Sequence, residues 1–145
     1  MYITVESGRR LMGRLPHGCD LLEELTRICQ EEGITLGKLS AIGALSRARV
    51  GYYDQEGREY RYLDFDQDLE LLCLMGNVSL KDGRPMVHAH VVLGDAQGRA
   101  FGGHLAPGCR VFACEFILQV YQAPQALERR FEPTTGLVLW SLPED

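Results

Sequence analysis

The sequence lacks the features that mark several common classes of protein. No apolar run reaches the roughly 18 residues that a membrane-spanning helix needs, and the first residues do not resemble a signal peptide. No internal repeat or low-complexity stretch occurs, and an apolar content of 46% is too high for a disordered chain. Lysine is scarce, and 15 basic residues against 20 acidic ones give a net charge of −5. We therefore predict a small, soluble, acidic protein with little positive charge for binding nucleic acid and no membrane contact.

The cysteines give no indication of disulfide bonds. Five occur, an odd number, and none forms a C-x-x-C pair. Cys73 and Cys114 lie within apolar runs, where a free cysteine behaves as a small hydrophobic residue. We therefore expect reduced thiols and a cytoplasmic location.

One segment has the apolar spacing of a helix. Asp20 can cap its N-terminus, with Glu23 three residues later as in a capping box, and Gly33 can end it. The apolar residues that share one helical face between them are Leu21, Leu22, Leu25, Ile28 and Cys29.

Most of the remaining chain alternates between apolar and polar residues with the period of a strand. The predicted strands are 2–6, 39–45, 48–53, 59–63, 69–80, 86–94, 99–105, 110–121 and 137–142. Nothing divides the 145 residues into two parts, so we expect one domain over residues 1–145. The pattern predicts an α+β fold with a central, largely antiparallel sheet, one main helix and room for a short second one.

Three of the four histidines lie within 17 residues, as His88, His90 and His104. Residues two apart on a strand share a face, so His88 and His90 point the same way. Asp95-Ala96-Gln97-Gly98 has the composition of a three-residue hairpin loop with a glycine bulge, which places His90 directly opposite His104. A two-residue loop would instead pair His90 with Gly103, so this convergence depends on the type of turn.

Three converging neutral imidazoles form a good site for Zn²⁺ or a similar divalent ion, and they leave a fourth position for water or substrate. The alternative is a set of surface or hydrogen-bonded histidines on a solvated strand. Gly102 and Gly103 add weak support, because paired glycines in a strand often mark the close approach of a ligand. They can equally mark the close approach of another backbone, a bulge or a subunit contact.

These residues resemble a known family, the plants-and-prokaryotes-conserved (PPC) domain. The resemblance is carried by Gly76-Asn77-Val78-Ser79, Gly83-Arg84-Pro85, His88-x-His90, Gly102-Gly103-His104-Leu105, Gly108 and Glu115. Earlier parts of the chain are similar too: Gly13, the turn at Gly18 with the helix after it, Ile42-Gly43-Ala44-Leu45, and residues 52–60.

The resemblance implies an α+β fold that usually assembles as a homotrimer. It also implies that His88, His90 and His104 hold a zinc ion, as in archaeal and bacterial members. The superfamily is similar to alpha-acetolactate decarboxylase, which holds zinc with an H-x-H pair and a later histidine. Plant members combine the domain with AT-hooks, bind AT-rich DNA and have generally lost the histidines, whereas this chain keeps all three and has no separate hook.

Two further residues are candidates for roles near the metal. Glu115 alternates with an apolar face, a half-apolar setting that could raise its pKa. It is a candidate general acid or base, or a partner for a ligand histidine, while an exposed or arginine-paired carboxylate is the alternative. If Asp82-Gly83 forms a two-residue turn, Asn77 falls opposite His88, where its amide could orient the ring.

Three functions remain open from the sequence. The leading one is a zinc-dependent hydrolase- or lyase-like activity on an unknown small molecule. The second is a DNA-associated regulator, which the acidic balance disfavours, although a trimer could gather Arg47, Arg49, Arg58 and Arg61 into a basic patch. The third is a zinc-stabilised trimeric module that binds a ligand without turnover. Whether the protein is an enzyme stays open.

Overall fold

The computed structural model describes residues 1–142. Among them is one helix, α1 (Leu21–Glu31), whose start follows from local chemistry. The Asp20 side chain accepts hydrogen bonds from the backbone N–H groups of Leu22 and Glu23, which have no partner within the helix. Gly33 follows the helix with a φ of +62°, a conformation that costs glycine little. The predicted helix and its cap are confirmed.

Strands make up most of the remaining regular structure. In chain order they are β1 (Glu6–Arg14), β2 (Gly37–Asp54), β3 (Glu59–Phe65), β4 (Leu69–Lys81), β5 (Arg84–Gly94), β6 (Ala100–Leu105), β7 (Arg110–Gln122), β8 (Arg129–Glu132) and β9 (Leu137–Trp140). The predicted α+β fold, with a largely antiparallel sheet and one main helix, is therefore confirmed.

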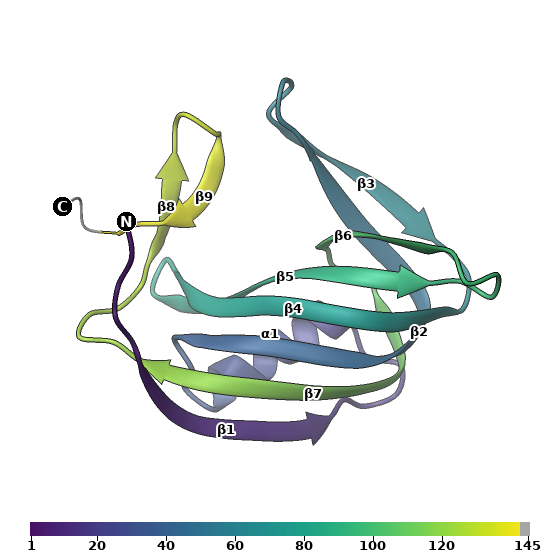
Figure 1. Ribbon diagram of the computed structural model, residues 1–145, viewed down its shortest axis with the longest axis horizontal. Helices are drawn as coiled ribbons and strands as arrows, with labels where there is room; N and C mark the ends of the chain where they lie inside the picture. The colour runs from purple at the N-terminus through teal and green to yellow at the C-terminus, as the bar shows by residue number, and fades with distance from the viewer. Residues whose placement is uncertain (143–145) are drawn as a thin grey trace.

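Seven strands form one sheet in the order β1-β7-β2-β4-β5-β6, with β3 paired to β2 (Figure 1). The long strand β2 pairs with different strands along its two halves. Its first half lies between β7 and β4, and its second half pairs with β3 and, at Val50 and Gly51, with β6. The contact with β6 curls the sheet, so that the β2–β3 hairpin stands up beside β5 and β6. Strands β8 and β9 form a separate hairpin, which stands at the upper left of Figure 1 while the β2–β3 hairpin stands at the upper right.

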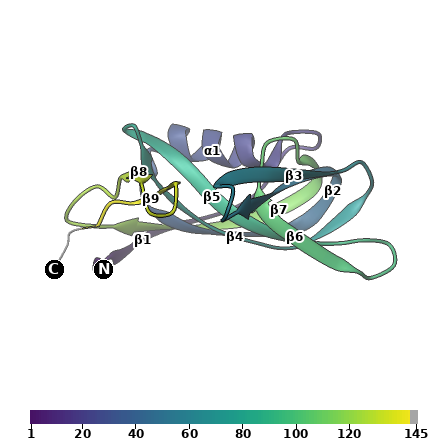
Figure 2. The same ribbon diagram turned by 90° about the horizontal axis from the view of Figure 1, so that it is seen from above.

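The core lies between helix α1 and the face of the sheet that the helix covers (Figure 2). The helix contributes the buried side chains of Leu21, Leu25 and Cys29. Alternate strand residues complete the core, including Leu39, Ala41, Leu74, Val78, Val87, Ala89, Val91, Leu93, Cys114 and Leu118. Removing this apolar surface from water is the main stabilising contribution. Because successive strand residues point to opposite faces, His88 and His90, which alternate with the buried residues of β5, lie on the other face.

That other face is open and partly apolar. Register places a row of directly opposed residues across it, namely Met12, Ile117, Ser40, Met75, His90 and His104. Met12, Ile117 and Met75 are 78%, 45% and 59% exposed. Directly opposed residues share a face. We call this row with the neighbouring Ile42 the apolar strip, and the histidines lie at one end of it.

Three expectations about the elements need correction. The first strand begins at Glu6 and pairs with β7, whereas residues 2–6 were expected to be the strand. The expected break at Ser46–Arg47 is a shift of register inside a continuous β2. Strand β8 has no counterpart among the predicted strands, because its Arg-Arg-Phe-Glu sequence has little apolar alternation. The last three residues of the expected domain, 143–145, lie outside the described residues.

Within the described part of the chain, no helix is long and apolar enough to cross a membrane.

Candidate metal centre

Three imidazole rings converge at the edge formed by β5 and β6. His90 and His104 are directly opposed, and His88 lies two residues along β5. The ring centroids are 5.1 Å apart for His88 and His104 and 5.4 Å apart for each of the other two pairs. One ring nitrogen from each histidine lies within 4.8 Å of the other two. The predicted convergence of the three rings is confirmed.

The turn between β5 and β6 produces this register. The N–H of Asp95 donates to the carbonyl of Arg99, and the N–H of Gly98 donates to the carbonyl of Asp95. Gly98 has a φ of +75°, the left-handed conformation of the expected glycine bulge. The Asp95 carboxylate also accepts hydrogen bonds from the backbone N–H groups of Gln97 and Arg99. Local turn chemistry therefore pairs His90 with His104.

The environment of the rings favours their neutral form. Burial lowers the pKa of His88 to about 4, and the nearby charge of Arg129 adds to the effect. Burial also lowers the pKa of His104, with contributions from His90 and Arg129. At pH 7 these two imidazoles are therefore neutral, which is the state that binds a metal ion.

The donor set fits a divalent transition metal. Among the buried side-chain nitrogen and oxygen atoms of the described residues, Nδ1 of His104 is one of two without a hydrogen-bond partner. Leaving such an atom unpaired costs about 1–3 kcal/mol of stability. Hydrogen bonds among the described residues therefore do not satisfy all the ring nitrogens of the cluster. Three neutral nitrogen ligands with room for a further ligand are typical of zinc sites that take water or substrate.

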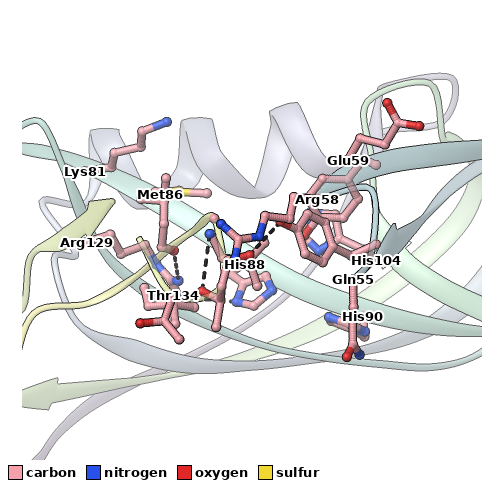
Figure 3. A pocket seen from close by; sticks show the side chains of 17 residues that line it. Gln55, Arg58, Glu59, Lys81, Met86, His88, His90, His104, Arg129 and Thr134 are labelled. Atoms are coloured by element: carbon pink, nitrogen blue, oxygen red, sulfur yellow. Dashed lines mark hydrogen bonds between the residues drawn. The ribbon is translucent and has the colours of Figure 1, made fainter. Parts of the chain in front are cut away.

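The histidines lie on the wall of a cavity of about 760 Å³, a size suited to a small molecule. The β2–β3 hairpin forms one side and the β8–β9 hairpin the other, so that Figure 3 shows Gln55, Arg58 and Glu59 across the rings from Arg129 and Thr134. The two hairpins touch, because the hydroxyl of Tyr53 donates to the carbonyl of Thr135 over 2.7 Å.

Arg129 is the residue of this site that the sequence did not indicate. Only 6% of it is exposed, and its guanidinium contacts no carboxylate within residues 1–142. Nε donates to Oγ of Ser79 over 2.8 Å, Nη2 donates to Oδ1 of Asn77 over 2.7 Å, and Nη2 lies 3.3 Å from Nδ1 of His88. Arg129 lies on the unpredicted strand β8, and no local motif distinguishes it from the neighbouring Arg130.

Asn77 lies where the register argument placed it. Asp82 and Gly83 both have positive φ, Lys81 pairs with Arg84 across a two-residue turn, and Asn77 is opposite His88. Its side chain contacts Arg129, which in turn approaches His88. The link from Asn77 to the ring that these contacts describe therefore runs through Arg129.

Gly102 and Gly103 do not line the cavity. A Cβ at Gly102 would lie 2.0 Å from the carbonyl oxygen of Val91, and one at Gly103 would lie 2.7 Å from that of Gly51. These glycines admit the backbones of β5 and β2, which corrects the interpretation that they mark a bound ligand. Their effect on the site is to let β6, with His104, lie close between those strands.

Glu115 is not brought to the histidines within one chain. It lies on β7, paired with Arg14 and Ile42, and strands β2 and β4 separate β7 from β5. Its side chain is exposed on the open face and does not line the cavity. The expectation that Glu115 lies beside the metal site is corrected for a single chain, because strand order rather than the alternation along β7 sets the distance.

The fold and the three-histidine cluster together define an α+β domain with a group of side chains that could hold a metal ion. The chain matches the Plants and Prokaryotes Conserved (PCC) domain over residues 2–122 and belongs to that family. The predicted resemblance is therefore confirmed. The β8–β9 hairpin, with Arg129, lies beyond the matched residues.

Solved structures agree with this assignment. The metal-containing protein AF0104 from Archaeoglobus fulgidus is 42% identical, with a TM-score of 0.92, covering 98% of this chain and 99% of that one. The plant- and prokaryote-conserved (PPC) protein from Pyrococcus horikoshii is 39% identical, with a TM-score of 0.91, covering 97% of this chain and 96% of that one.

A curated relative shares the domain within a much longer protein. The Bifunctional protein GlmU of Synechococcus sp. (strain JA-3-3Ab) is 38% identical over 124 residues, which are 85% of this chain. The chain spans only 19% of that relative's length. The match therefore concerns the domain and does not carry over the activity of the longer protein.

Proposed function

We propose that the protein holds one divalent metal ion, zinc in the first place, through His88, His90 and His104. The observation that carries the proposal is the convergence of three ligand nitrogens within 4.8 Å on the wall of a cavity of small-molecule size. The unpaired Nδ1 of His104 supports it, and so does a relative of 42% identity described as metal-containing.

We further propose a metal-dependent, hydrolase- or lyase-like activity on a small molecule in the cavity. A bound zinc ion supplies a Lewis acid and lowers the pKa of a coordinated water. The chain's own residues orient the ligand histidines and enclose the cavity. Arg129 and Asn77 hold the His88 side of the site, and Tyr60 packs against His104 with ring centroids 5.0 Å apart. Glu59 is the one carboxylate among the described residues that line the cavity.

The first experiment measures metal per chain in untagged protein by mass spectrometry. The wild type is compared with His90→Ala, which removes an exposed ligand, and with His17→Ala, a histidine outside the cluster. We expect about one zinc ion per chain in the wild type and in His17→Ala, and its loss in His90→Ala. A wild type that takes up no metal after zinc is added would contradict the proposal.

Turnover needs its own test, because a metal-stabilised binding module has the same ligands. The loaded protein is incubated with esters, lactones and 2-oxo acids, and His90→Ala serves as the blank. Product formed by the wild type and not by the variant supports an enzyme. If the wild type and His90→Ala form product at the same background rate, the result supports the binding module instead.

We also propose that copies of the chain cover the apolar strip in a homotrimer, the assembly that the family resemblance implies. The open face seen in Figure 2 supports this, since Met12, Ile42 and Met75 are 78%, 60% and 59% exposed there. Light scattering tests it. Met75→Lys should reduce the molecular mass of the assembly in solution, while Leu63→Lys, which changes an exposed residue on β3, should leave it unchanged.

A DNA-associated role is less well supported. It would need free arginines, yet Arg47 and Arg49 face Asp64, and Arg61 pairs with Asp54. With a net charge of −5, this leaves little positive potential for phosphates. DNA binding that weakens steeply with salt would reverse this judgement.

We infer a cytoplasmic, reducing environment from the thiols. All five cysteines are free. Burial raises the pKa of Cys29, Cys109 and Cys114 to about 11, so these thiols stay protonated and unreactive.

A further inference from the structure

The cavity beside the histidines carries the opposite charge to the rest of the molecule. The chain as a whole has a net charge of −5. Among the residues that the structure describes, the cavity lining contains the cations Arg58, Lys81 and Arg129 and one carboxylate, that of Glu59. Three neutral imidazoles add no negative charge, so a divalent ion held there would keep its full charge and increase the excess.

Arg129 shows that, among the residues the structure describes, this positive charge has no carboxylate partner. Its guanidinium is nearly buried, and the acceptors around it are the uncharged oxygens of Ser79, Asn77 and Val138. Burying a charge without a countercharge is costly. An anion in the cavity would supply the missing charge.

We propose that the cavity binds a small organic carboxylate next to the metal site, with Arg129 at its base and Arg58 and Lys81 towards its mouth. This inference rests on the proposed function and names the ligand class of the same site. Arg58 spans the opening, since its Nη1 donates to the carbonyl of Pro133 on the opposite hairpin. Lys81 lies at the edge of the cavity in Figure 3.

The number of free donors favours a carboxylate over a phosphate. A guanidinium has five N–H groups. The contacts of Arg129 to Ser79, Val138 and Asn77 occupy three of them. A neutral His88 whose one ring lone pair binds a metal ion cannot accept a fourth, so one N–H on Nη1 and one on Nη2 remain. Two remaining donors suit the two oxygens of a carboxylate, whereas a phosphate presents three acceptor oxygens and more charge.

The other walls indicate that the anion carries an apolar or aromatic part. Met86 and the β9 residues Leu137, Val138 and Leu139 line one side, and Tyr53 and Tyr60 line the other. An inorganic anion would leave this surface without a partner. A carboxylic acid with a short organic body would cover it while its carboxylate faces Arg129.

The test is titration calorimetry with acids and their neutral counterparts. The probes are acetate, lactate, butyrate and hexanoate, each beside its amide, and inorganic phosphate. We expect at least one acid to bind about tenfold more tightly than its amide, the ratio expected for one charge-assisted hydrogen bond. Acids that bind no better than their amides, or phosphate that binds better than every acid, would overturn the proposal.

Variants separate the cavity from the metal. Arg58→Gln and Lys81→Gln should each lower the affinity for the acid that binds best by about three- to tenfold, because each removes one positive charge near the site. Arg130→Gln, an exposed arginine next to Arg129 that does not line the cavity, should have no effect. Unchanged affinity in both cavity variants, with circular dichroism showing native folds, would mean that the acid binds the metal alone and would overturn the proposal.

Each titration is repeated on metal-free protein, after the metal content has been measured. If the wild type holds no metal, the proposed function fails, while the charge of Arg58, Lys81 and Arg129 still predicts a preference for acids over amides. If metal is bound and no preference for acids is found in either state, the present inference fails and the metal site stands.

Discussion

Nη2 of Arg129 lies 3.3 Å from Nδ1 of His88, although 41 residues separate them along the chain. The same nitrogen donates to Asn77, the residue directly opposite His88 on β4. A strand ladder and a separate hairpin therefore meet at one ring of the proposed metal site. The β8–β9 hairpin is part of the site's support as well as one wall of the cavity.

Replacement of Arg129 by lysine should destabilise the protein by about 2–3 kcal/mol. Lysine keeps the charge, but its single nitrogen cannot reach Ser79, Asn77 and Val138 together, so buried oxygens lose their donors. Urea unfolding of Arg129→Lys measures the cost, with the exposed Arg130→Lys as the matched control. Equal midpoints for the two variants would contradict the described network.

A methyl group at Gly102 should disturb the metal site from outside the cavity. Its Cβ would lie 2.0 Å from the carbonyl oxygen of Val91, so β6 must move away from β5. We expect Gly102→Ala to cost about 3 kcal/mol and to weaken metal binding.

Gly98→Ala is the control on the same hairpin. Its Cβ would meet nothing within 4 Å, and only the φ of +75° is unfavourable, at about 1 kcal/mol. Thermal unfolding and zinc titration of both variants check the difference. A Gly98→Ala variant that loses metal while Gly102→Ala keeps it would contradict the close approach of β6 and β5.

The metal-free protein should lose stability as the pH falls from about 6.5 towards 4. Burial lowers the pKa of His88 to about 4 in the folded chain, below the usual histidine value of about 6.5. Between these values the unfolded chain binds a proton that the folded chain does not, so acid favours unfolding, by up to about 3 kcal/mol.

Urea unfolding at pH 7 and pH 5 measures this dependence. His88→Gln should show a smaller loss than the wild type, and His17→Gln should match the wild type. A wild type whose stability is unchanged between the two pH values would show that His88 is not held neutral by its surroundings.

Glu115→Gln should leave the metal content and zinc affinity of the protein unchanged. Glu115 lies on β7, with β2 and β4 between it and the histidines of β5. His90→Ala provides the comparison that loses metal. Loss of zinc in Glu115→Gln would mean that the carboxylate reaches the site of a neighbouring copy across the open face of the sheet.

Much of the site could be predicted because its geometry is local. The spacing of His88 and His90 and the Asp95–Gly98 turn lie within one hairpin, and the rules of strand pairing then place His104. The opposition of Asn77 and His88 followed in the same way from the turn at Asp82 and Gly83. These relationships depend on turn chemistry and alternation, which are readable from short stretches of sequence.

Arg129 and Glu115 show where this reasoning ends. Alternation along β7 indicates the face on which Glu115 lies, but the order β7-β2-β4-β5 decides its distance from the histidines. Strand β8 has little alternation, and the proximity of Arg129 to His88 depends on how its hairpin folds back over the sheet. Strand order and hairpin docking are long-range outcomes that no local pattern specifies.

The sequence by itself therefore determined the capped helix, the strand periodicity, the α+β class and the convergence of three histidines, because each depends on neighbours in the chain or across one turn. The tertiary structure alone decided that a cavity adjoins the histidines, that Arg129 closes its base with no carboxylate partner in the described part of the chain, and that Glu115 lies elsewhere. These features arise where β2 curls to meet β6 and where the two hairpins touch through Tyr53 and Thr135. Such contacts form only when the whole chain buries its core.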